Sequence, residues 1–172
     1  MKKLLLLFLF ITITSFANAQ DAKPSKEETQ KFLNNMLSSV IGNPQDSDQP
    51  TIRKIQKQSF TNDFSDYLRQ NGDNEFRERD EYIRIPWQDF TDFIVITQKN
   101  DIQTIVRLIF KTKMEEKYFC CYVDEDNGIP ALTFTTDQFL IFLPNDKVES
   151  CKKAILRLAE IAKEENKDPF KN

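Results

Sequence analysis

The stretch WQDFTDFIVITQKNDIQTIVRLIFKT, residues 87–112, decides the fold. It contains two runs rich in aromatic and β-branched residues, the composition that is typical of strands. Between the runs, Asn100 and Asp101 are residues that favour a turn. The stretch therefore predicts two antiparallel strands joined by a short connection.

Runs of similar composition lie on both sides of this stretch. Before it come IRKIQKQSF, FSDYLRQ and EFRERDEYIRI, and after it come EKYFCCYVDED, IPALTFTT and QFLIFLP. FSDYLRQ could instead form a short turn of helix. Asn71-Gly72 and Asn127-Gly128 are strong hairpin signals, because a type I′ turn needs positive φ at both central residues. Consecutive strands joined by tight turns form a meander, so we expect about seven antiparallel strands in a bent sheet.

One helix is expected on each side of the strand region. Ser25 and Glu28 form a capping box, and Gly42 is a natural stop. Apolar residues at helical spacing between them predict one buried face: Phe32, Leu33, Met36, Leu37 and Val40. A second apolar stripe follows a cap at Asn145 or Asp146: Val148, Cys151, Ile155, Leu158 and Ala162. The predicted class is α+β, with the C-terminal amphipathic helix closing one end of the sheet.

This order of elements resembles a pleckstrin-homology-like barrel. The segment RIPWQDF, residues 84–90, is similar to a strand–Pro–aromatic–x–Asp–aromatic step of bacterial members, and the layout with a C-terminal DPF is similar to small exported Bacteroidetes proteins of unknown function. The resemblance covers roughly residues 50–170 and implies a barrel plugged by the last helix. Eukaryotic lipid-binding members carry a basic cluster in the first hairpin, where this chain offers only Arg53, Lys54 and Lys57. A shared fold does not imply a shared function.

Residues 1–19 read as a secretory signal peptide. Two lysines precede an apolar run, residues 4–13, that is shorter than the roughly 20 residues a membrane-spanning helix needs. A small-x-small motif then ends at Ala19, which predicts cleavage before Gln20. Because Gln rather than Cys follows the cut, lipid attachment is not indicated. The protein is expected to be exported, to the periplasm or the extracellular space.

Removal of residues 1–19 from the 172-residue chain leaves 153 residues, the size of one domain. We divide them into an N-terminal helix and linker, residues 20–50, and a β domain with its C-terminal helix, residues 51–172. The signal contains two lysines and no acids, so 22 basic and 27 acidic side chains remain and the net charge becomes −5. This charge argues against nucleic acid as a partner. No later segment is apolar enough to be transmembrane, and the partner is unknown; a protein of the envelope is one candidate.

The chain contains no histidine, which excludes Ser-His-Asp and Cys-His catalysis and imidazole-based zinc sites. Its three glycines are too far apart for a phosphate-binding loop. We therefore expect no cofactor, no metal and no catalytic residue. DEDNG, residues 124–128, lacks the spacing of an EF-hand loop and is interpreted as a hairpin tip. The spacing of Asp89 and Asp92 carries no catalytic signal in so acidic a chain.

The segment FRERDEYIR, residues 76–84, gives one candidate binding surface. Side chains alternate along a strand, so Arg77 and Arg79 share a face and could bind an anion or a sugar, with Trp87 lining a pocket beside them. The alternative is an edge strand whose charges protect it from aggregation, with Trp87 in the core.

The three cysteines raise the question of a disulfide. Strand alternation places Cys120 and Cys121 on opposite faces, and Phe119 and Val123 make the face of Cys121 the better core face. Cys151 lies on the apolar stripe of the last helix. A Cys121–Cys151 bond would close a loop of about 30 residues and contribute about 3 kcal/mol. Pairing of Cys120 with Cys151, a bond between the neighbours, and free thiols remain open.

These observations favour an exported, non-catalytic binding or accessory domain. Two alternatives remain, a structural subunit of an envelope complex and a carboxylate-based hydrolase. The hydrolase would need two acids about 5 to 9 Å apart in one cleft.

Overall fold

A bent antiparallel sheet and two α-helices make up the part of the chain that the computed structural model describes, residues 23–44, 53–61, 64–71, 76–96, 103–120 and 132–167. The helices are α2 (Lys26–Ser38) and α3 (Val148–Glu165), with short 3-10 helices η1 (Trp87–Asp89) and η2 (Asn145–Lys147). The strands are β1 (Arg53–Phe60), β2 (Phe64–Asn71), β3 (Phe76–Ile83), β4 (Phe90–Ile96), β5 (Thr104–Cys120) and β6 (Leu132–Leu143). This arrangement confirms the predicted α+β class.

The sheet is organised around β5, its longest strand. Five strands lie in the order β1-β2-β3-β5-β4, and β6 also pairs with β5. β4 pairs with residues 105–110 of β5 and β3 with residues 115–120, whereas β6 pairs with both halves. Since each strand has two edges, β3 and β4 follow one another along one edge of β5, and β6 occupies the other.

The predicted meander is correct for β1 to β3 and wrong at β4, which pairs with β5 and not with β3. The reason lies in the connection after β3. Arg84 has a φ of 57°, in the left-handed region that a residue with a side chain seldom adopts. Pro86 follows and leads into η1. The chain therefore turns out of the ladder and returns on the other half of β5.

The number of strands is smaller than expected because four predicted strands merge into two. The register between β5 and β6 jumps from Ile109–Gln138 to Met114–Thr136, so residues 110–113 lie opposite Asp137 alone. This large irregularity, with four residues opposite one, bends both strands, and both continue beyond it. Among the described strands the sheet remains open, and the expected barrel closure is absent there.

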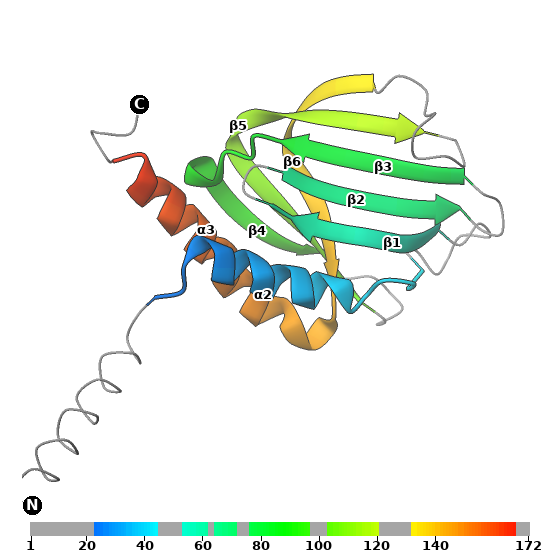
Figure 1. Ribbon diagram of the computed structural model, residues 1–172, viewed down its shortest axis with the longest axis horizontal. Coiled ribbons are helices and arrows are strands. Elements are labelled where there is room, and N and C mark those ends of the chain that lie inside the picture. Colours follow the sequence, from blue (N-terminus) through cyan, green and yellow to red (C-terminus); the bar gives the residue numbers. More distant parts are fainter. Residues whose placement is uncertain are drawn as a thin grey trace, which may run out of the picture.

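The helices cover one face of the sheet near β4 and β1, while β2, β3 and the end of β5 extend away from them (Figure 1). α2 begins with the predicted capping box, in which Ser25 and Glu28 bond each other's backbone N–H groups. It ends at Ser38, with Ser39 as its C-cap, four residues before the predicted stop, and the turn that follows contains Gly42, whose φ of 87° suits a glycine. The cap predicted for α3 is wrong: residues 145–147 form η2, and the N-cap is Lys147, without a side-chain bond.

Aromatic rings fill the core between the helices and the sheet. Phe139 of β6 stacks on Tyr82 at 4.8 Å and on Phe110 at 5.7 Å, measured between ring centroids. Phe60 and Trp87 complete the group, with the edge of one ring directed at the face of the other. Such pairs contribute beyond the area they bury.

Side-chain amides join α2 and β6 to β1 where no backbone ladder can form. Asn34 accepts from the Phe60 N–H at 2.7 Å and donates to the Phe60 carbonyl at 2.8 Å. Gln58, which is buried, makes the same pair of bonds to the N–H and carbonyl of Phe142, at 2.8 and 2.9 Å. Each amide thus bonds both backbone groups of one residue, Phe60 or Phe142, as a neighbouring strand would.

The structure reverses the faces predicted for the second half of β5. Tyr118 donates to Glu78 at 3.1 Å, on the side of the sheet that also bears the buried Tyr82 and Met114. Phe119 lies on the other side, beneath the guanidinium of Arg79. The expectation that Phe119 marks the core face is therefore wrong, because at this position the ring covers an arginine on the outside of the sheet.

Cys151 is a fully buried, free thiol on α3, packed within the core. Cys120 is the last residue of β5, opposite Glu78 in the register with β3, and Cys121 lies outside the described residues. Because Cys151 is a free thiol, neither the predicted Cys121–Cys151 disulfide nor a Cys120–Cys151 bond is formed in the structure.

Burial raises the pKa of the Cys151 thiol to about 12 from 9.0. A thiol that is harder to ionise in the folded state contributes stability below pH 9, and this contribution is lost as the pH rises toward 12. We expect the wild type to lose stability between these pH values relative to Cys151→Ala. Urea unfolding of both proteins at pH 8 and pH 10.5 measures the difference. A constant difference would contradict the burial of the thiol.

Candidate binding groove between the two helices

α2 and α3 lie side by side and run in opposite directions (Figure 1). Lys26 in the first turn of α2 contacts Glu165 at the end of α3, with 3.4 Å between Nζ and Oε2. Phe32, farther along α2, lies near Ser150 in the first turn of α3. Along their outer side, the two helices leave a groove.

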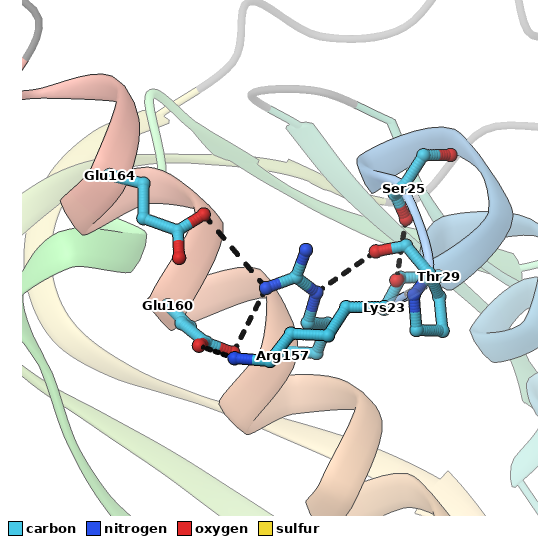
Figure 2. A network of polar contacts seen from close by, with 7 residues as sticks. Lys23, Ser25, Thr29, Arg157, Glu160 and Glu164 are labelled. Carbon is cyan, nitrogen blue, oxygen red and sulfur yellow. Dashed lines mark hydrogen bonds and ion pairs between the residues drawn. The ribbon is translucent and has the colours of Figure 1, made fainter. Parts of the chain in front are cut away.

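Arg157 fixes the end of this groove at the N-terminal side of α2. Its Nε donates to the Pro24 carbonyl at 2.9 Å, and its Nη1 donates to Glu160 at 2.9 Å (Figure 2). Lys23 also pairs with Glu160, and Glu164 lies 3.9 Å from Nη1. Lys23 first and Arg157 second lower the pKa of Glu160. These contacts hold the chain before α2 against α3.

The groove has a volume of about 640 Å³. Its lining is mainly apolar, with two cations and one carboxylate, and comprises Pro24, Glu28, Thr29, Phe32, Ser150, Lys153, Ala154 and Arg157. Ala154 and Thr29 are buried and form the floor. Lys153 is exposed and has no ion-pair partner among the described residues. The arrangement suits an apolar group that carries a negative charge.

Phe32 was expected on the buried face of α2 and is instead 48% exposed. Its neighbour Leu33 is fully buried, together with Met36 and Leu37. Successive residues differ by about 100° around a helix, so Phe32 lies at the border of the buried face and its ring is directed toward the groove. Phe32 is therefore not a core residue and is a candidate contact for a ligand.

The predicted strip of Arg77, Arg79 and Trp87 is not assembled. Trp87 is buried, its ring packs against Phe60 and Phe110, and its N–H meets no acceptor in the described part of the chain. Arg79 lies on the opposite side of the sheet, with 3.0 Å between its Nε and Glu81, an ion pair without hydrogen-bond alignment. The side chain of Arg77 lies outside the described residues.

Neither of the two described pockets brings a pair of acids together. The groove contains one carboxylate, Glu28, and a smaller pocket of about 390 Å³ beside α2 and Thr61 also contains one, Glu27. Asp89 accepts a hydrogen bond from Thr112, and Asp92 is exposed on β4. No cluster of three or more metal-binding side chains occurs among the described residues. The segment DEDNG lies outside them.

The sequence did not predict the groove, because the residues of its two walls are about 120 positions apart in the chain. Among the described residues, no helix is long and apolar enough to cross a membrane.

Comparisons of the chain with family models, with curated proteins and with solved structures find no match.

Proposed function

We propose that the protein is an exported, non-catalytic binding domain and that the groove between α2 and α3 holds its ligand. The groove carries this proposal. Its volume of about 640 Å³ is in the range of small-molecule sites, and apolar walls with a few converging charges are typical of them. Pro24 closes one end and is held there by Arg157.

The charges favour a ligand with an apolar body and an anionic group. Lys153 and Arg157 belong to α3 and lie one helical turn apart, so both face the same side of the groove. Phe32 offers an aromatic surface on the opposite wall. A carboxylate or sulfonate beside Lys153 would place an attached ring or alkyl chain against Phe32.

The dye 8-anilinonaphthalene-1-sulfonate has this chemistry and serves as the probe. We expect saturable binding of about one dye per protein, and Phe32→Ser should weaken it about tenfold, because burial of a phenylalanine is worth about 1.5–3 kcal/mol. Fluorescence titration measures both. Lys153→Glu should weaken binding as well.

Matched controls distinguish the groove from other apolar surface. Leu156 is 50% exposed on α3, close to the 48% of Phe32, and does not line the groove. Lys152 is an exposed neighbour of Lys153 that also lies outside the lining. Leu156→Ser and Lys152→Glu should bind the dye as the wild type does. Equal losses in the groove variants and in their controls would contradict the proposal.

A carboxylate-based hydrolase receives less support, since each described pocket is lined by a single carboxylate. A structural subunit of an envelope complex is favoured by apolar side chains on the outer face of the sheet. Ile94 and Leu140 are both exposed there, on either side of Arg107 in one row across β4, β5 and β6. In this case the protein would migrate in envelope extracts as part of a large assembly that the double variant Ile94→Lys/Leu140→Lys releases.

We further propose a distant relationship to pleckstrin-homology-like domains. The bent antiparallel sheet and the C-terminal helix packed on it support this relationship.

Export is proposed from residues 1–19. We expect the mature protein to begin at Gln20, as determined by N-terminal analysis of protein recovered from outside the cytoplasm, because small residues at Ala17 and Ala19 suit signal peptidase. Ala19→Leu should block processing and leave the precursor in the cell. A mature N-terminus elsewhere, or no processing, would contradict the interpretation.

A further inference from the structure

The first half of β6, residues 132–136, forms one edge of the sheet (Figure 1). On one side it pairs with residues 114–118 of β5. On the other side it has no backbone partner among the described residues. Leu132 is 58% exposed and Phe134 51% exposed, so their side chains are not covered either.

Two other parts of the sheet border are covered, the edge of β1 at the far side of the sheet and the second half of β6. The outer edge of β1 bonds to Gly42 and Asn43 through Ile55, and Asn34 satisfies Phe60. The second half of β6 has Gln58 bonded to Phe142. In contrast, the segment Leu-Thr-Phe-Thr-Thr has strong β-propensity and contains no charge and no proline, the features by which proteins usually protect an edge.

We propose that two copies of this chain pair through residues 132–136, strand against antiparallel strand, with Phe134 at the twofold axis. A twofold interface must be complementary to itself. About Phe134 the segment is nearly palindromic, because a threonine stands on each side. Antiparallel pairing would place Phe134 beside Phe134 of the partner subunit and Thr133 beside Thr135 of the partner subunit, and both kinds of cross-strand pair are favourable.

The charges of β5 are compatible with this register. Lys117 pairs with Thr133 and Glu115 with Thr135, so each outer row of the joined sheet would run from a lysine on one subunit to a glutamate on the other. Glu116 lies beside Phe134 on the inner side. The two copies of Glu116 would be three strand spacings apart, roughly 14 Å, which exceeds the screening length of about 8 Å at physiological salt. A second copy therefore meets no direct like-charge contact.

Sedimentation velocity of the purified protein over a range of concentrations tests the pairing. The wild type should form dimers, and Phe134→Lys should weaken dimerisation at least about tenfold, because it places two ammonium groups at the axis. The control is Leu156→Lys on α3, which introduces the same charge at another exposed apolar site and should dimerise as the wild type does. A wild type that stays monomeric, or a dimer that Leu156→Lys disrupts and Phe134→Lys does not, would overturn the proposal.

The register has a test of its own, which also covers the case of a poorly folded lysine variant. Directly opposed residues of antiparallel strands are close enough for a disulfide. Under mild oxidation, Phe134→Cys should yield a peptide that joins residue 134 of both copies, identified by mass spectrometry, whereas Leu132→Cys should not join to itself. The reverse result would overturn the register. The helix groove plays no part here, so dye binding and dimerisation can succeed or fail separately.

Discussion

Phe139→Ala is expected to lower the free energy of unfolding by about 4 kcal/mol, a large part of the stability of a domain of this size. Phe139 is buried, with three aromatic neighbours: Tyr82, Phe110 and Phe60. Truncation to alanine removes these contacts and leaves a cavity that rigid strands cannot close. Urea unfolding measures the loss, and Trp87, the only tryptophan, reports it by fluorescence.

The control for this prediction lies on the same strand. Phe134 is also a phenylalanine of β6, but it is 51% exposed. Phe134→Ala should change the stability of the monomer by less than about 1 kcal/mol. Similar losses for the two variants would mean that the aromatic group around Phe139 is not the core of the domain.

Gln58→Leu is expected to cost about 3 kcal/mol, although leucine has a similar size and is apolar. The variant loses both buried hydrogen bonds to the backbone of Phe142, and losing one partner of a buried hydrogen bond costs about 1–3 kcal/mol. Gln138→Leu, at an exposed position of β6, is the control and should have little effect. Equal stability of Gln58→Leu and the wild type would contradict the role of the amide.

Gln58→Glu gives the same prediction a dependence on pH. A protonated carboxyl can donate to the Phe142 carbonyl and accept from its N–H, as the amide does, whereas the ionised form cannot donate. Burial should raise the pKa of this carboxyl above its unfolded value of about 4.3. The stability it contributes is then present below about pH 4 and is lost as the pH rises through the folded pKa. Urea unfolding midpoints of Gln58→Glu and the wild type at pH 4 and pH 7 test this: the variant should be closer to the wild type at pH 4 than at pH 7.

Features set by neighbouring residues could be predicted from the sequence. Ser25 and Glu28 are close enough in the chain to define the capping box by themselves, and Gly42 belongs to the turn after α2, where its positive φ is tolerated. Each of the six strands overlaps a predicted run, because the composition of these runs distinguishes them from the connections, but β5 and β6 were each predicted as two strands. The hairpin between β2 and β3 was also correct, although Asn71 pairs with Phe76 and the connection spans four residues rather than two.

Features set by distant residues could not be predicted. The bulge that lets β5 run through Lys111 and Lys113 depends on β6, which pairs with it from the far side of a long connection. Gln58 and Asn34 carry no sign in the sequence that they bond to backbone groups of other elements. The groove arises only when Phe32 and Lys153, on separate helices, are brought to the same surface.

The most direct test of the central claim is an NMR titration of the protein labelled with nitrogen-15, with 8-anilinonaphthalene-1-sulfonate as the ligand. If the groove is the binding site, the backbone N–H signals that shift first will belong to Thr29, Phe32, Ser150 and Ala154. Signals of β2 and β3 will remain in place, because neither strand lines the groove and both extend away from the helices. Shifts concentrated on the sheet, or no saturable shifts, would contradict the assignment of the groove as a binding site.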